Sequence, residues 1–282
     1  MTDHAARPGP ARTIAFIGAT SGLGRAAASQ LAKDGHRLVL VGRDPKRVER
    51  LASQLPTAVV IGADISTTAG IDQAATQIEK AVDHLDALVN NAGVMIPTRQ
   101  TTVEGAELNL AIHHLAPYSM TSRLLPLLRA GSGRVVNVNS EGHRAPLFGG
   151  GSVRIDFRDL NMEHGYDPFL AYSRTKLANL LFTYELQRRH PELSVVAVHP
   201  GMVRTDLGRH WPRIQVAAMH ALSISARKGA EPVASLATRP VVECGGYYNH
   251  FTSTRSSSES YDNDVARRLW EVTEALRGPF GH

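Results

Sequence analysis

Residues 13–24 read TIAFIGATSGLG, in which a run of β-branched and aromatic residues leads directly into a glycine-rich turn. The run 13–17 is apolar at both alternations, which is typical of a strand covered on both faces. Glycines after such a strand let the backbone turn tightly and approach a pyrophosphate, which then lies on the N–H groups of the next helix. The spacing is G-x-x-x-G-x-G, and since such turns also serve plain strand-to-helix packing, this one alone does not settle the function.

The same alternation of short β-branched runs and longer helical patterns continues along the chain. It predicts an α/β fold, a Rossmann-type doubly wound parallel sheet of about seven strands with helices on both faces. Strands are expected at 13–17, 37–41, 58–61, 85–89, 134–138 and 194–198. Helices are expected at 23–33, 45–54, 69–82, 103–128, 170–189 and 262–276.

The chain has 282 residues, of which 43% are hydrophobic, enough for one large core. Neither a repeat nor a linker divides it, so we expect a flexible tail at 1–10 and a single domain at 11–282. Segments 141–169 and 204–228 lack a clear period and carry Gly, Pro, Arg and His. Long irregular insertions of this kind are usually binding loops or lids.

Composition argues against several classes of function. The net charge of +5 comes from scattered basic residues mixed with acids, as in 43–50, which does not indicate nucleic-acid binding. No apolar run is long enough to span a bilayer and residues 1–10 do not form a signal peptide, so we expect a cytoplasmic protein. Cys244 is the only cysteine and is expected to be a small buried residue. The thirteen histidines show no ligand spacing, so no metal site is predicted.

Arg43 follows the second predicted strand, where many dinucleotide folds carry an acid that binds the ribose hydroxyls. An arginine there suits a 2′-phosphate, which favours NADP(H) over NAD(H). Asp44 and Pro45 form a good N-cap and first helical position. Arg25 is a candidate for a second positive charge, although both arginines are also explained as surface residues.

Tyr172 and Lys176 lie one helical turn apart in the predicted helix 170–189. A tyrosine titrates near 10, whereas a general acid or base works best near the operating pH. A neighbouring ammonium favours the phenolate, so Lys176 is expected to lower the pKa of Tyr172 and to hold a cofactor ribose. By itself the Y-x-x-x-K spacing is common on ordinary helices.

Taken together, the motifs resemble the short-chain dehydrogenase/reductase family over nearly the whole chain, in the order that the family has them. The matching stretches are GATSGLG (18–24), GADIS (62–66), NNAG (90–93), VVNVNS (135–140), the Y-x-x-x-K pair and HPGMVRT (199–205).

The resemblance implies a role for each motif. Tyr172 would be the acid/base, Lys176 would lower its pKa, and Ser140 would hydrogen-bond the substrate oxygen. The implied cofactor contacts, besides Tyr172, Lys176 and Arg43, are Gly18, Thr20, Ser21, Gly22, Leu23, Gly24, Asp64, Ile65, Asn91, Ala92, Gly93, Pro200, Gly201, Val203 and Thr205. Structural alternatives remain: Asp64 as a helix cap, 90–91 as a turn, and 199–201 as a strand end.

Several details resemble the branch of retinol dehydrogenases and WW-domain oxidoreductases, among them IDFRDLN (155–161) and YSRTKLANLLFTYELQRR (172–189). Members of that branch commonly act on lipophilic alcohols and carbonyls, often with NADP. The chain lacks the membrane anchor that some members carry, so retinoid chemistry is not implied.

The family's asparagine on the helix before Ser140 is replaced by His113. Because the family uses a main-chain carbonyl there to hold a relay water, the histidine either preserves the proton relay, joins it or marks its loss. Asn109, one turn earlier, is a weaker substitute. His143 and Arg144, at the rim of the pocket, are expected to be loop hydrogen-bonding residues.

These observations predict an NADP(H)-dependent oxidoreductase that transfers a hydride between nicotinamide and a small lipophilic alcohol or carbonyl, with Ser140, Tyr172, Lys176 and His113 as catalytic residues. A homo-oligomer is compatible with them. The alternatives are a redox-neutral enzyme on the same fold (isomerase, dehydratase or cyclisation catalyst) and a non-catalytic NADP sensor. An apolar substrate wall is expected from Leu147, Phe148, Leu207, Trp211, Ile214, Val216 and Met219, with Trp211 alternatively a core or interface residue.

Overall fold

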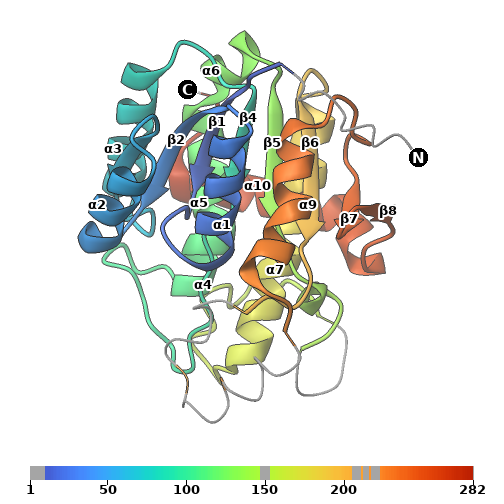
Figure 1. Cartoon of the computed structure of the whole chain (residues 1–282). Coiled ribbons are helices and arrows are strands. Elements are labelled where there is room, and N and C mark those ends of the chain that lie inside the picture. Colours follow the sequence, from blue (N-terminus) through green and yellow to red (C-terminus); the bar gives the residue numbers. More distant parts are fainter. Residues whose placement is uncertain (1–9, 147–152, 205–210, 212–215, 217–222, 282) are drawn as a thin grey trace.

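Eight strands form one sheet in the order β3-β2-β1-β4-β5-β6-β7-β8 (Figure 1). The computed structural model describes residues 10–146, 153–204, 211, 216 and 223–281. All neighbouring pairs are parallel except β7 and β8, which confirms the predicted Rossmann-type sheet with one strand more than expected. The strands are β1 Thr13–Ile17, β2 Arg37–Gly42, β3 Val59–Gly62, β4 Ala87–Asn90, β5 Arg134–Val138, β6 Ser194–His199, β7 Tyr247–Asn249 and β8 Thr252–Thr254.

The sheet is buried on both faces because its central strands carry apolar side chains on both alternations. Ile14 and Phe16 of β1 point to one face, and Ala15 and Ile17 point to the other. Both sets of side chains are at most 2% exposed. This is the pattern that parallel strands need when helices cover them on both sides.

Two layers of helices enclose the sheet. One core cluster joins the sheet to α1, α2 and α9, and the other joins it to α3, α5, α6, α7 and α10. In Figure 1, α1 and α9 lie in front of the sheet and α10 lies behind it. The helices are α1 Gly22–Lys33, α2 Pro45–Gln54, α3 Thr68–Ala81, α4 Leu108–Leu110, α5 Ala116–Arg123, α6 Leu125–Ala130, α7 Pro168–Arg189, α9 Ala226–Thr238 and α10 Asn263–Arg277, with shorter turns η1 Ala111–Leu115, η2 Glu141–His143 and η4 Ser258–Tyr261.

Helix starts follow the capping signals in the sequence. Asp44 accepts a hydrogen bond from the Arg47 N–H at 3.2 Å and precedes Pro45, so the predicted cap of α2 is confirmed. Asp167 caps α7 in the same way, ahead of Pro168, by accepting from the Leu170 N–H at 2.7 Å. Each such cap contributes about 1 kcal/mol to helix stability.

The predicted helix 103–128 is wrong as a single element. It is divided into α4, the π-helical turn η1, α5 and α6. Pro117 and Pro126 stand in the first turns of α5 and α6, where a proline is tolerated since its missing N–H has no intrahelical partner. The π-turn contains His113 and His114, both about 1% exposed.

Two regions differ further from the expectations. Helix α9 was not predicted, since Gly229 and Pro232 interrupt its pattern, and the three-residue strands β7 and β8 carry too short a signal. Cys244 is exposed, so the prediction that it is buried is wrong. Of the predicted tail 1–10, only Pro10 belongs to the described residues.

The predicted binding loop 141–169 has two different parts. Residues 153–157 pack in an apolar cluster with α7 and α10, where Val153 is 1% exposed. Of the described residues of this segment, Glu141, Gly142, Ala145, Pro146 and Phe169 line the large cavity at the carboxyl ends of the strands.

Candidate active site

A cavity of about 1110 Å³ opens where β1, β2, β4, β5 and β6 end. Ligands of doubly wound folds bind outside the carboxyl ends of the strands, near the point where strand order reverses. The cavity is lined by every predicted site residue except His113, which is buried behind it, and Thr205, which lies outside the described residues.

The glycine-rich turn connects β1 to α1 at the cavity wall. Ser21 precedes α1 without a side-chain cap, so the first N–H groups of the helix keep no side-chain partner from this residue. Gly18 has a φ of +86°, and a Cβ there would lie 2.7 Å from the Ala92 backbone. A Cβ on Gly24 would lie 2.0 Å from the Gly18 carbonyl oxygen. The turn thus fits a pyrophosphate held on backbone N–H groups.

The segment after β4 closes this turn. Asn91 Nδ2 donates to the Gly18 carbonyl at 2.8 Å, and the Asn91 N–H donates to the Ile17 carbonyl at 3.1 Å. Asn90 instead points into the sheet, where its Nδ2 donates to Asn137 Oδ1 at 2.9 Å. The pair therefore locks the turn to the sheet, and Asn91, Ala92 and Gly93 line the cavity.

Two cations stand at the end of β2. Arg43 is exposed and Arg47 is half-buried, and both line the cavity together with Asp44. Arg47 Nε lies 3.8 Å from Asp44 Oδ2. Arg47 is the second cation of the cavity, which the sequence analysis missed, whereas the candidate Arg25 does not line the cavity. The arrangement can bind a phosphate on a ribose that rests beside β2.

Asp64 and Ile65 line the cavity beyond β3. Asp64 Oδ1 accepts from the Ser66 N–H at 3.1 Å, whereas the N-cap of α3 is Thr67, which accepts from the Gly70 N–H. The helix-cap alternative for Asp64 therefore does not hold, although its carboxylate does support the turn.

Ser140, Tyr172 and Lys176 meet at the cavity from β5 and α7. Ser140 Oγ accepts from the Gly142 N–H at 3.1 Å, which leaves its own hydrogen for another acceptor. A Cβ on Gly142 would lie 3.2 Å from the Tyr172 ring, so the ring rests on this turn. Lys176 Nζ donates to the Val138 carbonyl at 3.0 Å and lies 5.6 Å from the centre of the Tyr172 ring.

The electrostatics of this trio differ from the sequence-based prediction. Burial raises the pKa of Tyr172, and a hydrogen bond with Ser140 only partly opposes it. Burial also lowers the pKa of Lys176 to about 7. The protein by itself therefore favours the protonated phenol of Tyr172 and the neutral amine of Lys176. The prediction that Lys176 lowers the pKa of Tyr172 is wrong for the protein without cofactor.

His113 joins two parts of the site. Its Nε2 accepts from the Val94 N–H at 3.1 Å, and its Nδ1 lies 2.8 Å from Thr175 Oγ1, which itself donates to the Tyr172 carbonyl. A backbone N–H can only donate, so Nε2 carries no hydrogen and Nδ1 carries one. Burial, and then the Lys176 charge, keeps the pKa of His113 well below its usual value, so this imidazole is neutral.

Asparagines connect the remaining backbone around this trio. Asn139 Nδ2 donates to the Lys176 carbonyl at 2.9 Å and to Asn179 Oδ1 at 2.8 Å. Asn179 Nδ2 donates to the His113 carbonyl at 2.9 Å, so the expected relay carbonyl has a partner within the protein. Asn109 Nδ2 donates to Glu107 and to Tyr166, so it does not replace the relay residue.

The segment after β6 forms the next wall. His199, Pro200, Gly201, Met202 and Val203 line the cavity. His199 is the residue of this set that the sequence analysis treated only as a strand end, and burial lowers its pKa to about 4. Its Nδ1 has no hydrogen-bond partner within the described residues.

Apolar side chains line the far end of the cavity. Trp211 packs on Phe169 with ring centres 5.0 Å apart, and its Nε1 donates to the Met95 carbonyl at 3.0 Å. Met95, Met202 and Val216 complete this wall. Leu147, Phe148, Leu207, Ile214 and Met219, the other predicted wall residues, lie outside the described residues.

In the part of the chain that the structure describes, His, Cys, Asp and Glu residues form no cluster suited to a metal ion. No helix there is both long and apolar enough to cross a bilayer.

A family model described as short chain dehydrogenase matches residues 12–152. The chain is 35% identical to "Putative daunorubicin C-13 ketoreductase DnrU" of Streptomyces sp. (strain C5), over 98% of this chain and 96% of that protein. It is 33% identical to human retinol dehydrogenase 14, over 95% of this chain and 86% of that protein. The chain belongs to the short-chain dehydrogenase family. It is an oxidoreductase of that family's retinol dehydrogenase branch, acting on CH–OH or carbonyl groups.

A solved relative has the same architecture. The match with the crystal structure of an uncharacterized protein from Mycobacterium paratuberculosis covers 99% of this chain and 98% of that chain, with a TM-score of 0.80 and 30% sequence identity. The Pseudomonas aeruginosa RhlG/NADP active-site complex, at a TM-score of 0.67 and 22% identity, shares the fold.

Proposed function

We propose that this short-chain dehydrogenase is an NADP(H)-dependent reductase of lipophilic ketones or aldehydes, able to run the reverse oxidation of the alcohol. The observation that carries the proposal is that Ser140, Tyr172 and Lys176 share one cavity with the phosphate turn and with Arg43. Gly18 and Gly24 allow the close backbone packing that shapes this turn, since a Cβ on either would meet the Ala92 backbone or the Gly18 carbonyl.

The cofactor would be held by three parts of the cavity. The phosphate turn and the first N–H groups of α1 would bind the pyrophosphate, and Arg43 and Arg47 would bind the 2′-phosphate. Asp64, Ile65 and residues 91–93 would line the adenine side, and Pro200, Gly201, Val203 and Thr205 the nicotinamide side. When bound, the nicotinamide supplies the hydride to the substrate carbon or receives it.

Tyr172 would exchange the proton with the substrate oxygen. Because burial raises the pKa of Tyr172, the phenol is protonated at neutral pH, and that is the form that carbonyl reduction consumes. Ser140 would direct its hydrogen to the same oxygen, since its Oγ already accepts from Gly142. Lys176, held by the Val138 carbonyl, would bind the ribose hydroxyls and adjust the Tyr172 pKa when the cofactor phosphates raise its own.

The apolar end of the cavity supports a lipophilic substrate. Phe169, Trp211, Met95, Met202 and Val216 offer aromatic and flexible aliphatic surface and few polar groups. The names of two relatives refer to the reduction of a ketone of daunorubicin and to the dehydrogenation of retinol.

The test follows the absorbance of NADPH with a panel of lipophilic ketones and aldehydes, for the wild type and for Tyr172→Phe. We expect turnover in the wild type and a loss of about 10²-fold or more in the variant, with NADPH affinity kept. Tight NADPH binding without oxidation across a wide panel would favour the redox-neutral or sensing alternative instead.

A further inference from the structure

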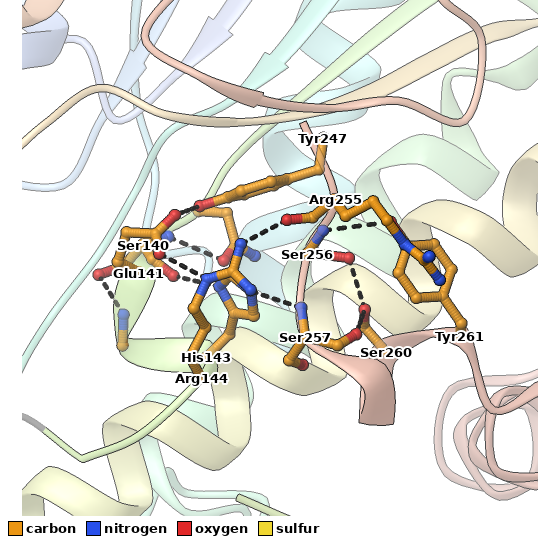
Figure 2. A network of polar contacts seen from close by, with 12 residues as sticks. Ser140, Glu141, His143, Arg144, Tyr247, Arg255, Ser256, Ser257, Ser260 and Tyr261 are labelled. Carbon is orange, nitrogen blue, oxygen red and sulfur yellow. Dashed lines mark hydrogen bonds and ion pairs between the residues drawn. The ribbon is translucent and has the colours of Figure 1, made fainter. Parts of the chain in front are cut away.

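The turn that carries Ser140 is attached to the C-terminal part of the chain by a network of polar contacts, shown in Figure 2, of which the bond between His143 and Ser257 is buried. Ser140 ends the β5 segment and η2 follows at once. Three side chains of this turn, Glu141, His143 and Arg144, reach across to residues 247–257.

His143 is the buried member of the network. It is 1% exposed, its Nδ1 lies 2.7 Å from the Ser140 carbonyl, and its Nε2 lies 3.1 Å from the Ser257 backbone nitrogen. A carbonyl can only accept and a backbone N–H can only donate, so Nδ1 carries the hydrogen and Nε2 does not. Both nitrogens are used, and the ring is a neutral bridge.

Burial and the Arg144 charge favour this neutral state, and they outweigh Ser140, Glu141 and Glu259, which act on the His143 pKa in the opposite direction. Tyr247 packs on His143 edge to face, with ring centres 5.0 Å apart, and donates to Glu141 Oε1 at 2.6 Å. Glu141 Oε2 accepts from Arg144 Nε at 2.6 Å, so its charge is engaged elsewhere. Burial is the largest influence on His143 and lowers its pKa. Protonation would place an N–H on Nε2 against the Ser257 N–H.

We propose that His143 is the positioning residue of the catalytic serine: as a neutral bridge between the Ser140 carbonyl and the Ser257 N–H, it fixes the backbone from which Ser140 presents its hydroxyl to the substrate oxygen. This rests on the proposed function. The residues proposed to bind the cofactor come from other segments, so we expect the bridge to affect the serine and not cofactor binding.

The contacts of Ser140 explain why the hydrogen bond from His143 to its carbonyl matters. The carbonyl is bound by His143, the N–H donates to Asn139 Oδ1 at 2.8 Å, and Oγ accepts from the Gly142 N–H. While these three contacts are kept, the hydroxyl hydrogen of Ser140 can be donated to an acceptor in the cavity. Loss of the carbonyl contact frees the turn to rotate, which disorients the donor without removing it.

The experiment compares His143→Gln with His143→Ala in NADPH-dependent ketone reduction. An amide offers one donor and one acceptor, as the neutral imidazole does, but it does not exchange protons in this pH range. We expect His143→Ala to lower kcat about 10-fold or more and His143→Gln to recover most of the loss, while the NADPH Kd of both variants stays at the wild-type value.

The matched control is Tyr184→Phe. Tyr184 OH forms a buried hydrogen bond with Ser256 Oγ at 2.6 Å in the same C-terminal segment, without contact with Ser140. We expect this variant to lose thermal stability with unchanged kcat. Equal kcat losses in Tyr184→Phe and His143→Ala would overturn the proposal, as would wild-type kcat in His143→Ala or a Gln variant as impaired as the Ala variant.

A second measurement covers the case in which His143→Ala does not fold. Imidazole ¹⁵N shifts of the wild-type protein report the tautomer directly. We expect the Nδ1–H form of His143 to persist through the pH range in which ordinary histidines become charged; titration of this ring within that range would overturn the proposal. Wild-type turnover and Tyr172→Phe test the proposed function separately, so the two failures are distinguishable.

Discussion

The two halves of the cavity are built in different ways. On the side of β1–β4, backbone segments pack directly against each other, because Gly18 and Gly24 carry no side chain. Asn91 holds the turn by donating a hydrogen bond to the Gly18 carbonyl. On the side of β5 and β6, buried polar side chains from distant segments fix the reacting groups, as His113 does between Val94 and Thr175. The comparison indicates that the half proposed to bind the cofactor depends on close backbone packing, whereas the half proposed to carry the catalytic groups depends on hydrogen bonds of buried side chains.

Lys176→Met is expected to have the largest effect of the variants on the two halves of the cavity. We expect turnover to fall about 10²- to 10³-fold, since the ribose contact and the charge near Tyr172 are both lost. We also expect a gain in stability, because a buried lysine with a pKa near 7 favours the unfolded state, in which its pKa is near 10.5.

The pH dependence of that gain has a definite direction. Below pH 7 both states carry the proton and the wild type bears the full cost of the buried ammonium, roughly 5 kcal/mol. Between pH 7 and about 10.5 the unfolded state binds more protons, so wild-type stability rises and the advantage of the variant fades. Denaturant titrations at several pH values measure this, and an advantage that grows with pH would contradict it.

Gly24→Ala is the corresponding change in the other half. Its Cβ would lie 2.0 Å from the Gly18 carbonyl oxygen, so the turn must shift, at a cost of about 1 to 3 kcal/mol in stability. NADPH affinity should fall about 10-fold with it. Thermal unfolding and cofactor titration give both values.

Gly62→Ala is the control for this steric argument, because its Cβ would have only Val48 atoms nearby, at 3.9 Å or more. It should be nearly neutral. If the Ala variants at 24 and 62 behave alike, the phosphate turn is not the tight contact described above.

Arg43→Asp has a smaller effect because the residue is exposed. The preference for NADPH over NADH, as a ratio of kcat/KM values, should fall about 10-fold. Arg25→Asp makes the same change of charge away from the cavity and should leave the ratio unchanged. An unaltered preference in Arg43→Asp would mean that the 2′-phosphate is bound elsewhere.

His113→Asn should have the smallest effect. An amide can keep a contact with Val94 or Thr175, so we expect kcat within about 3-fold of the wild type and an unchanged pH profile. His113→Ala should cost about 10-fold, since the buried partners lose their bonds. A loss in His113→Asn as deep as that of Tyr172→Phe would instead assign the imidazole a chemical step.

The sequence predicted best what local physics decides. The strand, turn and helix at 13–33, the cap at Asp44 and the placement of Tyr172 and Lys176 on one helix follow from periodicity and capping, and the structure has all of them. The family resemblance then added Ser140 and residues 91–93, which do line the same cavity.

The features that the sequence did not predict depend on burial and on contacts between residues far apart in the chain. The sign of the Tyr172 pKa shift follows from desolvation, which a Y-x-x-x-K spacing does not report. Arg47 enters the cavity because α2 begins at Pro45 and turns it back toward Arg43. His143 and Ser257 are 114 residues apart and are joined only by the fold.

The π-helical turn η1 has one more consequence, for anyone who transfers residues between this chain and a relative. A π-turn holds one residue more than the α-helical turn that it replaces, and each α-helical residue turns the axis by about 100°. A helical wheel drawn through 108–123 as a uniform coil would therefore rotate α5 against α4 by about that angle. Side chains grafted on that wheel would face the wrong neighbours, so this segment has to be transplanted with its bulge intact.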